Sequence, residues 1–274
     1  YGGLVRLYDV ATGTVTTTLH TGFHTVAWSP DGGRLATAGP QVSVRVWNAA
    51  TGAVAAELAG HAQKIKAVAW SPDGTRLATG AEDGTVRVWD PTTGTCAAVL
   101  AGHTGPVTDV AWSPDGTLLA TASGDASVRL WDPVAGEAIA TSGPTATVYS
   151  LAWSPDGTRL AAGAGNAITI TNHTDGTTTT LSTRVWGTYV FAWSPGGTRL
   201  AVITAESADV WDPIAAVAAV GLPIVPHSAR AAAWSPDGTL IAIADRASLR
   251  LCNAADGAEV AELERSGRTE FVHS

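Results

Sequence analysis

The sequence predicts an all-β protein in which one four-stranded antiparallel unit is repeated along the chain, and two regular spacings carry this prediction. The first is the phrase WSPDG, whose fifth copy reads WSPGG. Its copies begin at Trp28, Trp70, Trp112, Trp153, Trp193 and Trp234. The intervals between them are 42, 42, 41, 40 and 41 residues. A period of this length is typical of one supersecondary unit stacked many times.

The second spacing is a marker that follows each WSPDG tryptophan after 18 or 19 residues. Its copies are Trp47-Asn48, Trp89-Asp90, Trp131-Asp132, Thr171-Asn172, Trp211-Asp212 and Cys252-Asn253. An earlier copy, Tyr8-Asp9, has no WSPDG before it. The two markers therefore recur together, and each repeat has room for several short strands.

One repeat shows how the strands are predicted. Residues 65–70 and 85–89 alternate in the period-2 pattern of half-buried strands, and residues 76–79 and 96–100 supply the other two strands. Turn sequences rich in Pro, Asp and Gly separate the four segments. Four antiparallel strands repeated around an axis make a β-propeller, in which radial closure leaves few open sheet edges.

The domain expected from this pattern is a single propeller over residues 1–274. Six complete blades are predicted at approximately 22–59, 64–100, 106–140, 146–181, 187–220 and 229–263. Residues 4–19 match third and fourth strands, and residues 268–274 match a first strand. We therefore expect a seven-bladed ring whose seventh, seam blade lacks its second strand, with the missing segment cut away, disordered or supplied by a neighbour.

The paired markers resemble those of the WD-repeat β-propeller family over essentially the whole chain. The resemblance implies two internal hydrogen-bonded tetrads. They are His61, Thr79, Asp83 and Trp89, and His103, Thr121, Asp125 and Trp131. A buried carboxylate and imidazole are tolerable only when they are hydrogen-bonded. The repeat of Thr37 and Trp47 departs from this pattern because Gln41 stands where Asp is expected, and the last three repeats lack the His and the Asp, so we expect those blades to be looser.

Composition excludes several classes of function. The formal net charge of −8 argues against binding to nucleic acid or to an anionic membrane. Cys96 and Cys252 are the only cysteines, no apolar run is long enough to span a membrane, and no secretory leader opens the sequence. The chain starts at Tyr1 without any Met, so a piece of a longer protein is expected. A ratio of 14 Arg to 2 Lys suggests a bacterial gene, and we expect a cytoplasmic location.

Catalysis is not predicted. His61, Asp83 and Thr79 could be mistaken for a triad, but the same spacing recurs in the next repeat beside no distinct nucleophile. The sequence holds no G-x-S-x-G elbow, no H-E-x-x-H pair and no phosphate-binding Gly-Lys-Ser/Thr loop. The Asp of each SPDG stands alone in its own turn, unlike the clustered oxygens of a calcium loop. No metal and no cofactor are expected.

The variable side chains at the start of each first strand are the predicted binding residues. The slot four residues before each WSPDG tryptophan holds His24, Lys66, Thr108, Tyr149, Tyr189 and Arg230, and Trp186 lies beside one of these positions. We expect His24, Lys66, Tyr149, Trp186, Tyr189 and Arg230 to lie at one mouth of the central channel and to bind a protein or peptide, with Lys66 and Arg230 favouring an acidic segment. The alternatives are ordinary rim residues, a small-ligand or glycan-binding propeller that stacks its ligand on Tyr149, Trp186 and Tyr189, and a propeller hydrolase.

Overall fold

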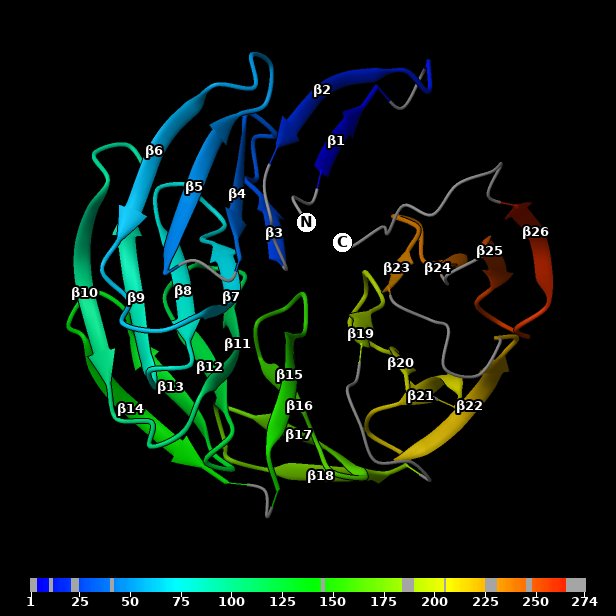
Figure 1. Ribbon diagram of the computed structural model, residues 1–274. Helices are drawn as coiled ribbons and strands as arrows, with labels where there is room; N and C mark the ends of the chain where they lie inside the picture. The colour runs from blue at the N-terminus through cyan, green and yellow to red at the C-terminus, as the bar shows by residue number, and fades with distance from the viewer. Residues whose placement is uncertain are drawn as a thin grey trace. The chain divides into compact units, whose positions relative to one another are not determined.

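The computed structural model describes residues 4–9, 12–20, 25–39, 42–143, 146–183, 190–204, 206–224, 231–244 and 248–264. All the regular secondary structure in these ranges is β-strand (Figure 1). The residues fall into two compact units, 1–142 (unit 1) and 143–274 (unit 2).

Unit 1 contains one two-stranded and three four-stranded antiparallel sheets, each with its strands in chain order. The hairpin consists of β1 (Leu4–Tyr8) and β2 (Val15–His20). The first four-stranded sheet consists of β3 (Thr25–Trp28), β4 (Arg34–Ala38), β5 (Ser43–Asn48) and β6 (Val54–Ala59). The second consists of β7 (Ile65–Trp70), β8 (Leu77–Ala81), β9 (Thr85–Asp90) and β10 (Thr95–Ala101). The third consists of β11 (Val107–Trp112), β12 (Leu119–Ser123), β13 (Val128–Asp132) and β14 (Glu137–Ser142).

Unit 2 contains three more four-stranded sheets of the same order. The first consists of β15 (Val148–Trp153), β16 (Arg159–Ala164), β17 (Ala167–Asn172) and β18 (Thr178–Ser182). The second consists of β19 (Val190–Trp193), β20 (Leu200–Ile203), β21 (Ala208–Asp212) and β22 (Val217–Leu222). The third consists of β23 (Ala231–Trp234), β24 (Leu240–Ala244), β25 (Ser248–Asn253) and β26 (Glu259–Glu264).

The predicted fold class is confirmed, because six four-stranded antiparallel blades and a two-stranded piece are the elements of a seven-bladed β-propeller with one incomplete blade. Residues 268–274, expected to form the first strand of the seam blade, lie outside the described residues. Gln41 lies outside them as well.

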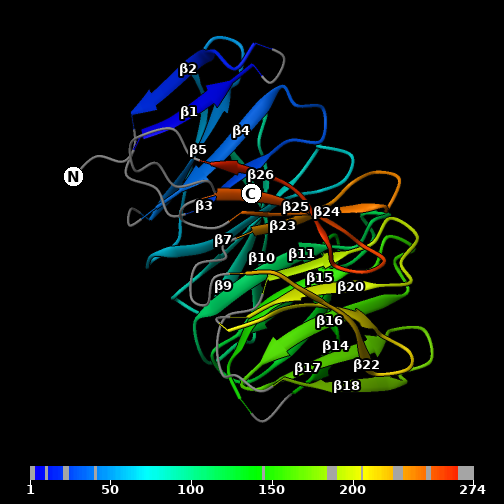
Figure 2. The ribbon, with the colours of Figure 1, turned by 90° about the vertical axis from the view of Figure 1, so that its right-hand side faces the viewer.

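The hydrophobic core of each unit lies between neighbouring blades. Val44 and Val46 of β5 pack with Trp70 and Leu77 of the next blade. In unit 2, Val210 of β21 likewise packs with residues of the blade β23–β26. The hairpin β1–β2 is covered in the same way, since Leu7 and Leu19 pack against the blade β3–β6 of unit 1, beside which Figure 2 shows it. A blade thus buries its apolar faces only through its neighbours, as in other repeat proteins.

The SPDG turn joins the first two strands of a blade by a fixed set of hydrogen bonds. In the blade β7–β10 the Ser71 hydroxyl donates to Asp73 Oδ1 at 2.6 Å, and the Thr75 N–H donates to the same oxygen at 3.0 Å. Gly74 has φ +69°, a left-handed conformation that favours glycine. The hydrogen bond from Ser71, followed by those from Thr75, lowers the pKa of the Asp73 carboxyl to about 2, so the turn holds a carboxylate at neutral pH.

Candidate functional site

The most distinctive polar cluster of unit 1 is a chain of hydrogen bonds inside the blade β7–β10. Trp89 Nε1 donates to Thr79 Oγ1 at 2.8 Å, and this hydroxyl lies 2.7 Å from His61 Nε2. His61 Nδ1 lies 3.1 Å from Asp83 Oδ2. Because the Trp89 indole can only donate, the Thr79 hydroxyl accepts from it and donates its own proton to His61 Nε2. The remaining proton of the imidazole is then on Nδ1, from which it is donated to Asp83. The imidazole is then neutral.

The blade β11–β14 repeats this chain with nearly the same distances. Trp131 Nε1 donates to Thr121 Oγ1 at 2.8 Å, which lies 2.8 Å from His103 Nε2, and His103 Nδ1 lies 3.0 Å from Asp125 Oδ2. The structure therefore brings together all four members of both predicted tetrads. In each tetrad the Thr is fully buried and its hydroxyl already has two partners, so no reactive hydroxyl faces solvent.

The pKa values of the tetrad groups shift in the directions that keep His neutral and Asp charged. Burial is the largest influence on His61 and His103, and it lowers both pKa values although the neighbouring carboxylates oppose it. Burial on its own raises the pKa of Asp83, but hydrogen bonds from Thr85, the Ala62 N–H and His61 outweigh it and lower that pKa to about 2. Hydrogen bonds likewise lower the pKa of Asp125.

Acid is expected to destabilise the tetrads. Since the folded pKa of each tetrad His lies below its ordinary value of 6.5, the unfolded chain binds more protons than the folded chain as pH falls through that value. The stability that the Asp83 carboxylate contributes is lost at lower pH, as the pH falls from the ordinary pKa of 3.8 to the folded pKa of about 2. We expect the urea midpoint to fall between pH 7.5 and 5.5, and less steeply in a His61→Gln, His103→Gln variant. A midpoint equally pH-dependent in both proteins would contradict this assignment.

The blades β3–β6 and β19–β22 keep only parts of the tetrad. In the blade β3–β6, Trp47 Nε1 donates to Thr37 Oγ1 at 2.8 Å. In the blade β19–β22 the indole N–H of Trp211 is buried and meets no acceptor among the described residues. The strand register explains this. Trp211 pairs with Leu200 as Trp89 pairs with Leu77. The residue two positions after the Leu is Thr79 in one blade and Val202 in the other, so Val202 stands where the hydroxyl acceptor would be.

A Val202→Thr variant is expected to be more stable than the natural chain. The new hydroxyl would accept from Trp211 Nε1, and a satisfied hydrogen bond of this kind contributes about 1 kcal/mol. A Val202→Ala variant, which removes apolar volume without adding an acceptor, is the matched control and should unfold at a lower temperature. Thermal unfolding of the three proteins tests the expectation, which fails if the Thr variant is no more stable than the natural protein.

The WSPDG tryptophans join neighbouring blades. The indole N–H groups of four of them donate to the carbonyl of the residue before the corresponding tryptophan of the preceding blade. These bonds are Trp70 to Ala27 at 3.0 Å, Trp112 to Ala69 at 3.1 Å, Trp193 to Ala152 at 3.1 Å and Trp234 to Ala192 at 2.8 Å. Two of the rings also make a cation–π contact with an Arg of the preceding blade. Arg34 Cζ lies 4.7 Å from the centroid of the Trp70 ring, and Arg159 Cζ lies 5.1 Å from the centroid of the Trp193 ring. The motif therefore serves the packing of blades.

Of the six predicted binding residues, the structure describes two. Lys66 is the second residue of β7 in unit 1 and is exposed, and its Nζ lies 3.0 Å from Glu82 Oε1. Tyr149 is the second residue of β15 in unit 2 and is 42% exposed. His24, Trp186, Tyr189 and Arg230 lie outside the described residues. Sequence reasoning missed the Lys66–Glu82 pair, although Glu82 stands in the second turn of the same blade.

The backbone departs from the regular ladder at this slot in three blades, as it also does between the third and fourth strands in the pairs β5–β6 and β9–β10. The strand register shifts at Lys66, at Thr108 and at Tyr149, so that each is the extra residue of a β-bulge in its first strand. Bulges re-aim a side chain and recur at binding sites.

The described residues show no group of three or more His, Cys, Asp or Glu placed to hold a metal ion. Within the same ranges, no helix is long and apolar enough to cross a membrane.

Repeated four-stranded blades, blade-joining tryptophans and buried His–Asp–Thr–Trp tetrads define the chain as a β-propeller of the WD-repeat type. The family model described as IFT122 first beta-propeller matches residues 22–211, which is about two thirds of the chain, and the chain belongs to this family. No curated protein matches the chain with significant similarity.

Proposed function

We propose that the protein is a non-enzymatic interaction module that binds a protein or peptide through the side chains at the start of its first strands. The observation that carries this proposal is the β-bulge at Lys66, Thr108 and Tyr149. The bulge places a residue whose type varies from blade to blade at a position where the backbone departs from the regular ladder. His24, Trp186, Tyr189 and Arg230 extend the proposed surface by their sequence positions.

The polar groups that resemble catalytic residues support the same conclusion. In both tetrads the imidazole and the hydroxyl are buried and bonded to one another and to an indole. A nucleophile needs an accessible atom and a free base, and the tetrads offer neither. We therefore propose that the propeller acts by binding a partner through its exposed side chains. The cytoplasm is the proposed location.

The charge of the partner is set by Lys66 and Arg230 in this proposal. Lys66 is held by Glu82 at 3.0 Å, with both side chains partly exposed. Exposed pairs of this kind are worth little, so an acidic segment could exchange with Glu82 at small cost. A Glu82→Gln variant would then bind an acidic partner more tightly than the natural protein.

Substitution at the slot tests the proposal. A Lys66→Ala, Tyr149→Ala variant and a Trp186→Ala, Tyr189→Ala variant are each compared with the control Val134→Ala, which changes an exposed apolar residue in the turn before β14. We expect both double variants to lose partners that mass spectrometry identifies on the immobilised natural protein, with unchanged thermal unfolding. If both double variants retain every partner, the binding surface lies elsewhere on the blades and the proposal is wrong.

A further inference from the structure

The turn from Ser194 to Arg199 in unit 2 lacks a carboxylate that the equivalent turns carry, and we propose that it binds the carboxylate of another molecule in its place. This turn is the WSPGG copy of the motif, in which Gly196 stands at the Asp position. The proposal concerns a site distinct from the slot at the start of the first strands and does not rest on the proposed function.

The five turns that keep the Asp define what the carboxylate does there. The Ser hydroxyl donates to Asp Oδ1 at 2.5 or 2.6 Å in every one of them. The N–H two residues after the Asp donates to the same oxygen at 3.0 Å in every one. Where that residue is Thr, its hydroxyl also donates to the carboxylate, as Thr158 does to Asp156 at 2.9 Å. Three donors therefore converge on one carboxylate.

The WSPGG turn keeps the same backbone and the same donors. The Ser194 N–H donates to the Arg199 carbonyl at 2.9 Å, the Gly197 N–H to the Ser194 carbonyl at 2.8 Å, and the Arg199 N–H to Ser194 Oγ at 3.0 Å. The corresponding bonds of the Ser154 turn measure 2.8, 2.9 and 2.9 Å. Only the acceptor is missing, because glycine has no side chain.

The donors left over are the Ser194 hydroxyl and the hydroxyl and N–H of Thr198, and none of them donates to an acceptor among the described residues. Ser194 is only 6% exposed, so its hydroxyl proton is held inside the protein. A Cβ built on Gly196 would meet no atom within 4 Å, so the space that the Asp side chain fills elsewhere is open here. Thr198 is exposed, so its two donors can be reached from solvent, whereas a buried donor such as the Ser194 hydroxyl is costly to leave without an acceptor. A carboxylate is the group that the same geometry binds five times in this chain.

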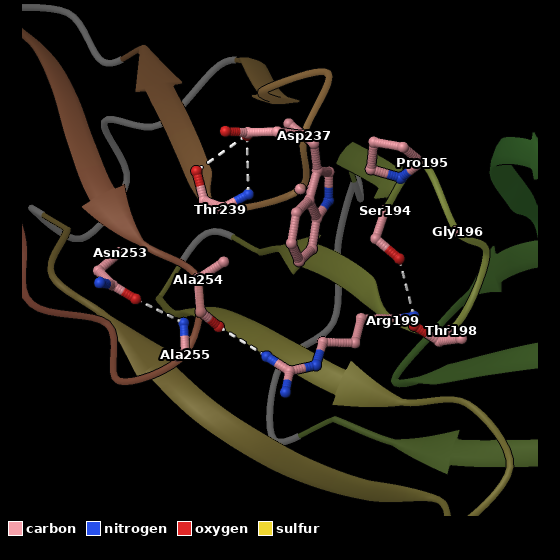
Figure 3. A pocket seen from close by; sticks show the side chains of 12 residues that line it. Ser194, Pro195, Gly196, Thr198, Arg199, Asp237, Thr239, Asn253, Ala254 and Ala255 are labelled. Atoms are coloured by element: carbon pink, nitrogen blue, oxygen red, sulfur yellow. Dashed lines mark hydrogen bonds between the residues drawn. The ribbon is translucent and has the colours of Figure 1, made fainter.

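The turn opens into a cavity of about 500 Å³ within unit 2, between the blades β19–β22 and β23–β26 (Figure 3). Ser194, Gly196, Thr198 and Arg199 form one wall, and Asp237 belongs to the other. The cavity has room for more than one carboxylate group, so its occupant can be a small organic acid or a peptide that carries a carboxylate.

The wall of the cavity that holds Gly196 also supplies a cationic side chain, Arg199. Arg199 donates from Nη1 to the Ala254 carbonyl at 2.8 Å, and Figure 3 shows its guanidinium reaching across toward the blade β23–β26. The described residues show no carboxylate within 4 Å of this guanidinium, whereas Arg159, which donates to the Gly197 carbonyl at 2.6 Å, is paired with Asp156 at 3.8 Å. Asp237 is already the acceptor for Ser235 and Thr239 in its own turn. A bound carboxylate would thus meet three hydrogen-bond donors at the turn, with the charge of Arg199 in the same cavity.

Acetate is the probe for the test, with acetamide as the uncharged control of the same shape. In amide-detected NMR titrations we expect acetate to shift the Thr198 N–H resonance saturably, and acetamide to leave it nearly unchanged. Two peptides distinguish the sources of the carboxylate, one with an internal Glu and an amidated C-terminus, the other with a free C-terminus and no acidic side chain. Competition by the first peptide identifies an acidic side chain as the source, and competition by the second identifies a C-terminus. If neither peptide competes with acetate, the bound molecule is a small organic acid.

Two variants decide the outcome. Gly196→Asp restores the internal carboxylate at a position with open space and no left-handed φ, so it should fold, unfold at a higher temperature and lose the acetate response at Thr198. Asp156→Gly creates the same vacancy in the blade β15–β18 and should gain an acetate response at Thr158. The proposal is overturned if acetate shifts Thr198 equally in the natural protein and in Gly196→Asp, or if acetamide acts as acetate does.

Discussion

Replacing Trp70 with Ala is expected to lower the free energy of unfolding by about 3–5 kcal/mol, the range found for removing a large aromatic side chain from a core. Trp70 is 8% exposed and belongs to the core between the blades β3–β6 and β7–β10. Its ring lies under Arg34, and its N–H satisfies the Ala27 carbonyl. The variant loses the apolar burial, the cation–π contact and the hydrogen bond together. Urea unfolding monitored by circular dichroism measures the loss.

Trp28→Ala is the matched control, because it removes the same side chain from the same motif. Trp28 is 49% exposed, so much less buried area is lost. We expect a loss of about 1 kcal/mol or less, in the range of surface substitutions. A Trp70→Phe variant separates the ring from the hydrogen bond, since it keeps most of the apolar area and removes only the donor to Ala27. Equal losses for Trp70→Ala and Trp28→Ala would show that the motif tryptophans do not join blades.

The strands could be predicted from the sequence because each blade is specified by local signals. The predicted strand 65–70 is β7 itself, and the predicted strand 85–89 is β9 without its last residue. Alternating residues and Pro-Asp-Gly turns act over a few residues, and the 41-residue period repeats them six times. The tetrads followed from a family resemblance, since hydrogen bonds between residues as far apart as His61 and Asp83 leave no local pattern.

The links between blades could not be predicted from the sequence in the same way. The bond from Trp70 to Ala27 joins residues 43 positions apart, and only the packing of two sheets brings them together. The indole N–H of Trp211, which meets no acceptor among the described residues, had a visible signal in the sequence, Val202 in place of a hydroxyl residue. The spacing from the motif tryptophan to Trp211 is one residue shorter than in the first three blades, and this hides the equivalence. Gly196 was visible as WSPGG, yet its consequence depends on donors that only the three-dimensional turn aligns.

Replacing Asp83 with Ala is expected to destabilise the protein by about 1–3 kcal/mol, the cost of leaving buried polar groups without partners. The carboxylate accepts from the Ala62 N–H at 2.8 Å, from the Thr85 N–H at 2.9 Å and from the Thr85 hydroxyl at 2.7 Å, and it lies 3.1 Å from His61 Nδ1. His61 is buried, and without Asp83 its Nδ1 keeps only the Thr85 hydroxyl, 3.2 Å away, which has itself lost its acceptor. The loss therefore spreads along the whole chain of bonds to Trp89.

The comparison with Gln41→Ala tests whether the tetrad is the cause. Gln41 stands at the position of Asp83 in a repeat where Leu19 occupies the position of His61, and we expect Asp83→Ala to lower the melting temperature more than Gln41→Ala does. Asp83→Asn keeps one acceptor oxygen for His61 and should fall between Asp83→Ala and the natural protein. Because the same bonds hold the pKa of Asp83 near 2, the difference between Asp83→Ala and the natural protein should shrink as pH falls from 4 toward that value. Equal melting temperatures for Asp83→Ala and Gln41→Ala would mean that packing alone, without the buried hydrogen bonds, stabilises these blades.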